Sequence, residues 1–324
     1  MPAWNVAAID SLPELAERLE LSLEQLQWLA DVRGLERSVN SERLRNDRYR
    51  LLPRASGVPR VLEIPKGRLK EVQRWVLREI LNQIPTHPAA HGFVRGSSVR
   101  THAEVHSGQA MVLGLDLKDF FASVRRAQVK AIFRAAGFET EVARTLAGLC
   151  TNTTPRHVGA SRLLATPHLP QGAPSSPALA NLAAFALDRR LSGLAYAHDL
   201  LYSRYADDLT FSGPMPGRGR RRFLVALATE IARDEGFAIN ERKTAMHPAG
   251  GRQQVCGVVV NARPNVPRRD YDRLKATLHN LAAAGPVDRS EAAALAGRIA
   301  WVASLNPARG AKLREKYAKI EWSE

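Results

Sequence analysis

Two adjacent carboxylates, Asp207 and Asp208, stand between two short segments of alternating polarity, LLYSRYA (200–206) and LTFSG (209–213). This pattern predicts two strands joined by a tight hairpin, with the acidic pair at its tip. Neighbouring carboxylates repel each other and are costly unless they are solvated or bound to a cation. The alternative is an Asp-rich turn with no chemical role, because Asp is common in turns.

A third carboxylate, Asp116, ends the short apolar segment MVLGLD (111–116), which predicts a buried strand. The Gly- and Pro-rich strip LPQGAPSSP (169–177) opens a predicted helix. An acid at a strand end and an acid pair at a hairpin tip can converge on two divalent ions roughly 3.5–4 Å apart, one activating a hydroxyl and the other holding a triphosphate. Oxygen ligands favour Mg²⁺ over zinc or copper. The predicted catalytic residues and metal ligands are therefore Asp116, Asp207 and Asp208, with two Mg²⁺ ions.

The segments that must hold these acids in place form a helical start, a mixed middle part and a helical end. Residues 11–37 predict two short helices, because leucines recur at helical spacing after the N-cap candidates Ser11 and Ser22. Further along, the sequence predicts a hairpin over 49–65, an amphipathic helix from Leu69 to Pro85, a helix over 176–194 capped by Ser176, a helix over 222–235, one strand over 253–261, and helices over 269–283, 290–304 and 307–320, the last capped by Asn306.

The charge of the chain points to a polyanionic partner. The 324 residues include 47 Lys and Arg against 32 Asp and Glu, which gives a net charge of +15. Residues 1–50 hold seven basic and nine acidic side chains, so the excess lies in the rest of the chain. A basic body with a nearly neutral N-terminal segment suits nucleic acid.

Composition excludes several classes of protein. With 45% hydrophobic residues the chain can bury a real core, yet no apolar stretch reaches the length of a membrane span. Acidic side chains near the start argue against a signal peptide. Two cysteines, Cys150 and Cys256, cannot build a disulfide framework or a four-ligand zinc site. We therefore expect a cytoplasmic protein with no membrane contact.

In order and interval, the motifs resemble those of reverse transcriptases over roughly residues 45–320. YADDLTFSG is similar to the catalytic Y-x-D-D hairpin of these enzymes, and LGLDLKDFFASV to their first catalytic motif. LPQGAPSSPALAN and GFAINERKT resemble two further motifs, the second with its lysine. The resemblance implies an α+β right-hand polymerase fold, with an N-terminal helical extension over 1–48, fingers and an antiparallel palm over 49–262, and a helical thumb over 263–324.

Within that superfamily the sequence resembles a bacterial retron reverse transcriptase. The supporting strings are SGVPRVLEIPKGRLKEVQRWVLREIL, HGFVRGSSVRTHAEVH and CGVVVNARPNVPRRDYDRLK. Such an enzyme primes from the 2′-hydroxyl of a guanosine in a structured noncoding RNA and makes RNA-linked single-stranded DNA. The resemblance thus implies as partners a cognate structured RNA, its DNA product, dNTP substrates and, in phage defence, a separate effector protein.

The resemblance also implies a nucleotide pocket. Arg60 would reach the triphosphate, since a planar guanidinium suits phosphate oxygens, and Phe121 would exclude a ribose 2′-hydroxyl by steric clash. Gln171 and Gly172 would line the pocket, while Lys243 would neutralise or protonate the departing pyrophosphate. The alternatives are solvated positions for the two basic residues and a core position for Phe121.

Two regions that the retron resemblance links to recognition of the cognate RNA depart from the usual pattern. Where these enzymes show N-A-x-x-H the chain reads HAEVH, and where they show V-T-G it reads VCG. Basic pairs such as RR suit phosphate contact as well as plain solvation. The residues expected to contact RNA are His102, His106, Val255, Cys256, Gly257, Arg268 and Arg269.

Two other functions compete with the retron assignment. One is another bacterial reverse transcriptase, of the group II-like or abortive-infection type, and a structured RNA gene immediately upstream would argue against it. The other is a non-catalytic RNA-binding scaffold on a polymerase fold, against which the intact acids Asp116, Asp207 and Asp208 argue.

Overall fold

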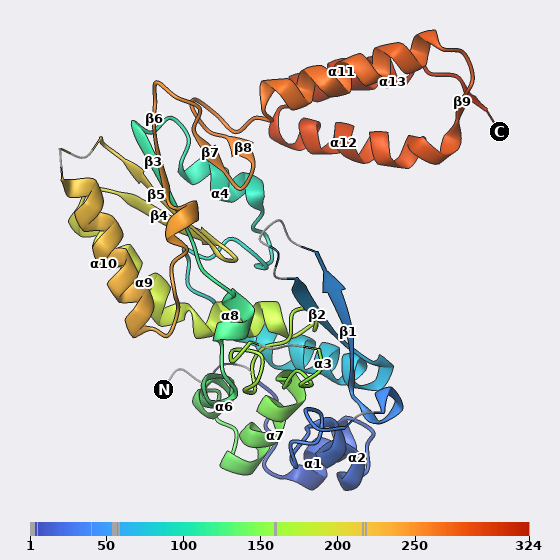
Figure 1. Ribbon diagram of the computed structural model, residues 1–324, viewed down its shortest axis with the longest axis vertical. Coiled ribbons are helices and arrows are strands. Elements are labelled where there is room, and N and C mark those ends of the chain that lie inside the picture. The colour runs from blue at the N-terminus through green and yellow to red at the C-terminus, as the bar shows by residue number, and fades with distance from the viewer. Residues whose placement is uncertain are drawn as a thin grey trace.

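The computed structural model describes residue 4 and residues 6–39, 41–53, 57, 59–158, 161–215, 217 and 219–323. Figure 1 shows a helical base, a central sheet with helices against it, and a group of three helices set apart at the C-terminal end. The smaller elements of the base and the connections are α5 (Phe120–Ser123), α6 (Arg126–Ala135), α7 (Thr140–Cys150) and the 3-10 helices η1 (Glu42–Leu44), η2 (Leu81–Gln83), η3 (Glu241–Lys243) and η4 (Arg289–Glu291). No helix among these described ranges is both long and apolar enough to cross a membrane.

The two N-terminal helices are confirmed as α1 (Leu12–Arg18) and α2 (Leu23–Leu29). Each begins at its expected serine, because Ser11 Oγ accepts the Glu14 backbone N–H and Ser22 Oγ accepts that of Gln25. Their apolar faces are buried in the helical base.

The hairpin expected over 49–65 forms from β1 (Asp47–Leu52) and β2 (Arg60–Pro65), which pair antiparallel. The tip of this hairpin, residues 54–56 and 58, falls outside the described residues. The amphipathic helix α3 (Gly67–Glu79) follows directly and buries the apolar face that the sequence predicted. It ends earlier than expected, since η2 replaces its last turn before Pro85.

A four-stranded antiparallel sheet occupies the centre of the molecule, with the strand order β4-β5-β3-β6. Its strands are β3 (Met111–Asp116), β4 (Leu201–Tyr205), β5 (Asp208–Gly213) and β6 (Ala245–Pro248). The predicted hairpin is confirmed, but its two-residue turn is Ala206-Asp207. Asp208 already belongs to β5, where it pairs with Tyr205.

Helices cover both faces of this sheet, and the alternation along β4 decides which side chain meets which helix (Figure 1). Ser203 points to α4 (Val99–Val105), where it hydrogen-bonds two histidines. Tyr202 and Arg204 point the other way, to Asp188 of α9 (Phe185–Ala197). The helix expected over 222–235, α10 (Arg220–Asp234), packs beside α9.

The helix predicted over 176–194 is in fact two helices, α8 (Ser176–Ala183) and α9, because the backbone at Ala184 leaves the helical region. Ser176 is not the cap either. Its hydroxyl donates to the Pro170 carbonyl at 2.7 Å, which ties the start of α8 to the preceding loop, and Ser175 takes the N-cap position.

The single strand predicted over 253–261 is also wrong. Two short strands, β7 (Gln254–Val255) and β8 (Val258–Val259), pair antiparallel and are joined by the turn Cys256-Gly257. Both turn residues have left-handed φ angles, +46° and +82°. A cysteine with a left-handed φ angle is uncommon, so the sequence Cys256-Gly257 did not indicate a turn.

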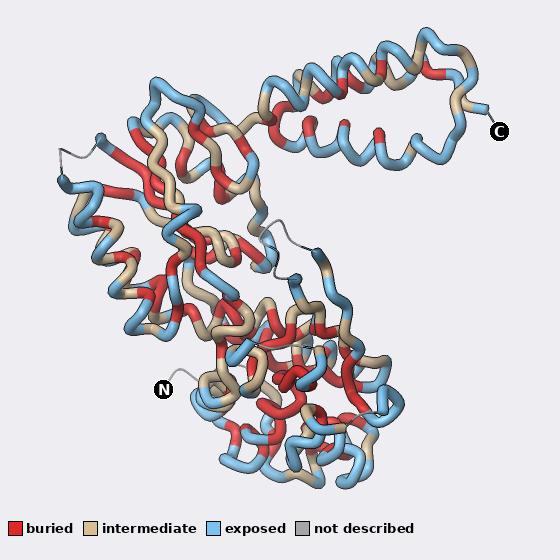
Figure 2. Tube along the Cα trace, in the orientation of Figure 1, coloured by how far each residue is buried: buried red, intermediate tan, exposed pale blue. Residues whose placement is uncertain are grey.

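The three C-terminal helices confirm the helical end of the chain. α11 (Arg268–Ala283), α12 (Ala292–Leu305) and α13 (Pro307–Tyr317) enclose a second, smaller core, as Figure 2 shows by the buried stretches on their inner sides, and this core continues into the β7–β8 hairpin and to Ala103 and Val112. Asn306 caps α13, as expected, by accepting the Arg309 backbone N–H. A short parallel pair, β9 (Val287–Asp288) and β10 (Trp322–Ser323), closes the group.

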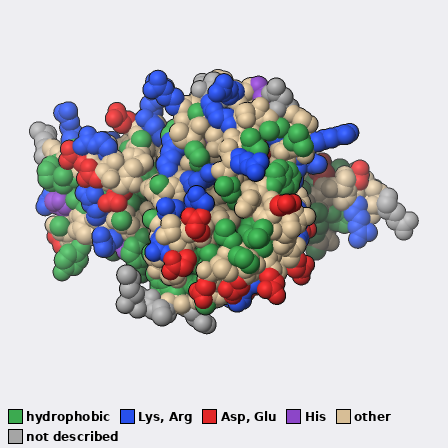
Figure 3. Space-filling model, turned by 90° about the horizontal axis from the view of Figure 1, so that it is seen from below, with side chains coloured by type: hydrophobic (Ala, Val, Ile, Leu, Met, Phe, Trp, Pro, Cys, Tyr) green, Lys and Arg blue, Asp and Glu red, His purple; other side chains and the backbone are tan. Residues whose placement is uncertain are grey.

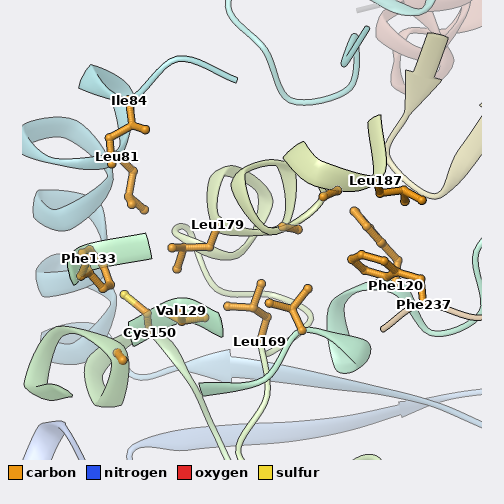
Figure 4. Close-up of a cluster of buried hydrophobic side chains, with 14 of the residues drawn as sticks. Leu81, Ile84, Phe120, Val129, Phe133, Cys150, Leu169, Leu179, Leu187 and Phe237 are labelled. Atoms are coloured by element: carbon orange, nitrogen blue, oxygen red, sulfur yellow. The ribbon is translucent and has the colours of Figure 1, made fainter. Parts of the chain in front are cut away.

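The larger core joins the helical base to one face of the central sheet. Figure 4 shows its middle, where side chains from α6, α7, α8 and η2 meet, among them Leu81, Val129, Phe133, Cys150 and Leu179. Phe120 and Phe237 pack together at its far end, with ring centroids 5.6 Å apart. The base that carries β2 and the sheet that carries the acids therefore form one continuous core.

Candidate active site

The strand register brings the three predicted acids to one end of the sheet. In the antiparallel pair of β3 and β5, Asp116 lies directly opposite Asp208. Asp207 occupies the adjoining turn, and its carbonyl accepts the Leu117 backbone N–H at 2.9 Å. Residues about ninety positions apart in the chain are thus neighbours in space.

Two side chains from the segment before β6 hold Asp116 in place. Lys243 Nζ donates to Asp116 Oδ2 at 2.8 Å, and Asn240 Nδ2 donates to Asp116 Oδ1 at 3.1 Å. The same hydrogen bond raises the pKa of Lys243. The sequence reasoning missed Asn240, although its position three residues before the lysine in GFAINERKT was a usable signal.

The acids repel one another. Burial raises the pKa of Asp207 and of Asp208, and the charge of a neighbouring carboxylate raises each pKa further. Among the described residues, no three acidic, His or Cys side chains are arranged so that they could hold a metal ion directly. The donor chemistry nevertheless fits a hard cation, because clustered carboxylate oxygens that repel one another are the ligands Mg²⁺ takes. In this arrangement Lys243 supplies the only positive charge hydrogen-bonded to Asp116 within the described residues.

Close backbone packing fixes the turn that presents Asp207. Ala206 has a left-handed φ of +56°, which is strained for a residue with a side chain. Gly92 lies against it so closely that a Cβ at Gly92 would be 2.5 Å from the Ala206 nitrogen. Only glycine fits at this position.

A fully buried ion pair supports the same turn from the opposite side of β4. Arg204 Nη2 donates to Asp188 Oδ2 at 2.6 Å, with both side chains 0% exposed. Its Nη1 donates to the Ala206 carbonyl and to Asn181 Oδ1, each at 3.0 Å. Asn181 in turn donates to the Gly92 carbonyl at 2.8 Å. One network thus joins both segments that shape the turn, and nothing in the local sequence predicted it.

A cleft of about 400 Å³ opens beside Asp207. Three of the residues predicted for a nucleotide pocket line it together, namely Arg60, Phe121 and Gln171. Phe93, which the sequence reasoning did not select, lines it as well, with its ring 6.1 Å from that of Phe121 and 6.5 Å from that of Tyr205.

The adjacent phenylalanines differ in burial. Both border the cleft, but Phe120 is 3% exposed and packs in the core against Phe237, while Phe121 is half-buried. Gly172 lies where the loop after Gln171 presses on β2, because its φ is +138° and a Cβ there would be 2.7 Å from the Glu63 carbonyl oxygen. The need for glycine at that position therefore comes from a close approach of backbone to backbone.

The predicted RNA contacts are spread over three places. His102 and His106 are fully buried on the inner face of α4, where they hydrogen-bond Ser203 and Ser212, so neither side chain reaches the surface. Burial lowers the pKa of His102 to about 2 and that of His106 to about 3. Any effect of these residues on RNA must therefore act through packing.

The second place is the β7–β8 hairpin. Val255 is buried, whereas the turn Cys256-Gly257 approaches the acids, with Cys256 Sγ donating to Asp208 Oδ2 at 3.4 Å. Burial raises the pKa of this thiol, so it stays protonated and can donate. The third place is the start of α11, where Arg268 and Arg269 are exposed.

The part of the chain that matches a known family contains the three acids and the cleft. Residues 52–258 match the family described as reverse transcriptase (RNA-dependent DNA polymerase). The chain is 42% identical over 85% of its length to the retron Mx65 reverse transcriptase of Myxococcus xanthus, and 36% identical over 98% to the retron Mx162 reverse transcriptase of the same organism. It spans 65% and 69% of those two proteins. Among solved structures, a foamy viral protease-reverse transcriptase in complex with double-stranded DNA aligns over 85% of this chain and 39% of its own, at 14% identity and a TM-score of 0.47.

Proposed function

The chain belongs to the bacterial retron reverse transcriptases, and from this premise we propose that it is an RNA-directed DNA polymerase. The observation that carries the proposal is the register of β3 and β5, which places Asp116 opposite Asp208 beside the cleft that holds Arg60, Phe121 and Gln171. Clustered acids beside a cleft of about 400 Å³ that carries an arginine suit nucleotidyl transfer.

Asp116, Asp207 and Asp208 are the residues that would hold two Mg²⁺ ions. When bound, these ions would supply activation of the attacking hydroxyl and neutralisation of the triphosphate. Lys243 holds Asp116 by an ion pair at 2.8 Å, which places its ammonium where it can neutralise departing pyrophosphate.

The pocket residues bind and select the incoming nucleotide. Arg60 lies at the start of β2 on one wall of the cleft, where its guanidinium can pair with phosphate oxygens. Phe121 lies near the acids, where its ring would clash with a ribose 2′-hydroxyl. Gln171 lines the cleft as well, and Gly172 follows it where the loop packs against β2.

We further propose that the chain divides into an N-terminal extension (residues 1–48), fingers and palm (49–262) and a thumb (263–324). The helices α11–α13, which stand apart from the central sheet in Figure 1, support the last boundary. Side chains around a cavity between α11 and α13 are mostly cationic, and these suit the phosphates of a structured RNA; they include Arg263, Lys275, Arg309, Lys312, Lys316 and Lys319.

The substrate that we propose is a structured noncoding RNA, which the enzyme copies in part into RNA-linked single-stranded DNA. The names of the relatives, each a retron reverse transcriptase, support this. On family resemblance alone we extend the proposal to a cytoplasmic complex that acts in phage defence with a separate effector protein.

The test is primer extension by the purified full chain on an RNA template with Mg²⁺ and dNTPs. The wild-type protein should extend the primer, and Asp207→Asn should lose roughly 10²–10³-fold or more of the rate, because the amide keeps the size but not the charge that holds a cation. Asp199→Asn is the matched control, since this exposed Asp lies just before β4 and its loss changes the net charge equally. Steady extension by the Asp207→Asn protein would contradict the metal-ligand assignment.

Sequencing of the nucleic acid that copurifies separates the competing functions. A retron enzyme should carry DNA joined to RNA through a 2′-linkage. DNA without that linkage would identify another kind of bacterial reverse transcriptase, and RNA alone, with no extension by the wild-type protein, would identify a scaffold.

A further inference from the structure

Both oxygens of a buried carboxylate in β2, Glu63, have hydrogen-bond partners. Its Oε1 accepts Asn152 Nδ2 at 2.9 Å and the Thr154 hydroxyl at 2.6 Å, and its Oε2 lies 2.9 Å from His168 Nε2. The side chains of Glu63 and His168 are 2% and 0% exposed. A carboxylate withdrawn this far from water must make these contacts or destabilise the fold.

The partners of His168 determine where its protons lie. His168 Nδ1 is 2.8 Å from the Thr166 carbonyl, which can only accept, so Nδ1 carries a proton. The other ring nitrogen, Nε2, faces Glu63 Oε2. Because a lone pair on Nε2 would repel the carboxylate, one proton is shared between these two atoms, and this hydrogen bond links β2 to the segment that carries His168.

The same two elements lie side by side at the nucleotide cleft. Glu63 donates its backbone N–H to the Gln171 carbonyl at 3.0 Å, and its own carbonyl is the atom that leaves room only for glycine at Gly172. Arg60 lies three residues before Glu63 on the same strand, and Gln171 lies three residues after His168. Arg60, Glu63 and Gln171 line the cleft, whereas Gly172 and His168 do not.

We propose that Glu63 and His168 are a pair of positioning residues that hold β2 against the loop carrying Gln171 at the nucleotide pocket, and thereby set the KM for dNTPs. The proposal rests on the polymerase function proposed above. The pair touches neither the acids nor the reacting atoms, so it acts through the placement of Arg60 and Gln171. Its loss should weaken nucleotide binding and leave the chemical step largely unchanged.

Two variants test the pair. His168→Leu removes both nitrogens, and the KM for dNTPs should rise by roughly tenfold or more while kcat changes by less than about threefold. Glu63→Gln should stay close to wild type, because its amide oxygen can accept from Asn152 and Thr154 while its amide N–H donates to the free lone pair of His168. The affinity for the primer–template should be unchanged in both variants.

The matched control is Gln73→Leu. Gln73 is 1% exposed, and its hydrogen bond to the Leu149 carbonyl at 2.8 Å joins α3 to α7 in the same base, away from the residues that line the cleft. Its loss should alter the melting temperature and not the KM for dNTPs. An equal rise of KM in Gln73→Leu, or no rise in His168→Leu, would overturn the proposal.

Hydrogen exchange gives a readout that does not depend on activity. In His168→Leu the peptides covering 59–66 and 166–175 should lose protection together, while α3 keeps its own. Unchanged protection in both peptides would contradict the pair's role even if the chain proved unable to extend a primer. Failure of extension by the wild-type protein with coupled loss of protection would instead refute only the polymerase function.

Discussion

At the scale of single residues, Phe121 is predicted to select the sugar of the incoming nucleotide, whereas its neighbour Phe120 stabilises the fold. Both rings border the cleft, but Phe121 is half-buried, while its neighbour Phe120 is 3% exposed and packs in the core against Phe237. Phe121→Val should raise ribonucleotide incorporation relative to deoxyribonucleotide by roughly tenfold or more, since a discrimination that rests on a clash disappears with the clashing group. Single-nucleotide insertion with matched dNTP and rNTP pairs measures the ratio.

Phe120→Leu is the control for that prediction. It removes a buried ring of the same type one position away, and it should cost about 1–3 kcal/mol of stability with no change in sugar selection. If Phe121→Val leaves the ratio unchanged, or Phe120→Leu shifts it equally, Phe121 does not exclude the 2′-hydroxyl.

Single residues were predictable where a motif fixes both the residue type and the spacing. Asp116, Asp207 and Asp208 come together as their positions at a strand end and a hairpin tip indicated. The direction in which a side chain points was not predictable for His102 and His106. Helical spacing puts both on one face of α4, but only the packing of that helix on the sheet decides that the face is buried.

At the scale of elements, the buried pair of Arg204 and Asp188 makes β4 a support for the catalytic turn. Removing one partner of a buried ion pair leaves an uncompensated charge, so Arg204→Leu should cost about 3–5 kcal/mol of stability. The double variant Arg204→Leu/Asp188→Leu should recover most of this loss. It should remain impaired in primer extension, because the Ala206 carbonyl still lacks its donor.

Thermal unfolding and primer extension on the same two variants check the prediction. Recovery of both stability and activity in the double variant would show that the pair serves the fold alone. Loss of activity in a well-folded double variant would show that the turn depends on the hydrogen bond from Arg204.

The histidines between α4 and the sheet predict sensitivity to mild acid. Burial lowers the pKa of His106 to about 3, below its unfolded value, so between those two values the unfolded chain binds more protons than the folded one. Stability contributed by the neutral ring is therefore complete above the unfolded pKa and is lost as the pH falls towards the folded pKa, by up to about 1.4 kcal/mol per pH unit. His102 acts in the same direction.

Denaturant unfolding at pH 7, 6 and 5 measures this slope. His106→Gln should flatten it, because an amide can keep hydrogen bonds to the serines and does not titrate in this range. The same slope in the wild-type protein and in His106→Gln would assign the acid sensitivity to other groups.

Elements were predicted well where local signals mark their ends, and less well where tertiary contacts interrupt them. Ser22 and Asn306 cap the helices that they were expected to cap. The break at Ala184 has no Gly or Pro to announce it. There the chain turns so that α9 can follow the sheet, which is a property of the assembled core.

At the scale of the whole molecule, the distribution of charge predicts where nucleic acid binds. Figure 3, seen from the end that carries α1 and α2, shows Asp and Glu side chains among Lys and Arg on that face. The cavity between α11 and α13 instead collects cations with a single acid, Glu315. Binding of RNA should therefore weaken steeply with salt and depend on the C-terminal helices.

Lys312→Ala/Lys316→Ala should reduce the slope of log K against log salt by about 1–2, since each phosphate contact contributes roughly 0.7–0.9. Filter binding of a structured RNA between low and moderate salt gives the slope. Arg33→Ala/Arg43→Ala, in the nearly neutral N-terminal segment, removes the same charge and should leave the slope unchanged. Equal slopes for the two double variants would place the RNA elsewhere.

The order of strands in the central sheet has a consequence during protein synthesis. β3 is apolar and almost wholly buried, and both of its neighbours, β5 and β6, lie later in the chain. About ninety residues separate it from β5, so at ~5–20 residues per second it leaves the ribosome roughly 5–20 s before its first partner. During that time an apolar strand with two unpaired edges is exposed on the nascent chain. The order of synthesis therefore predicts that β3 is the segment most at risk of aggregation until the hairpin of β4 and β5 has been made.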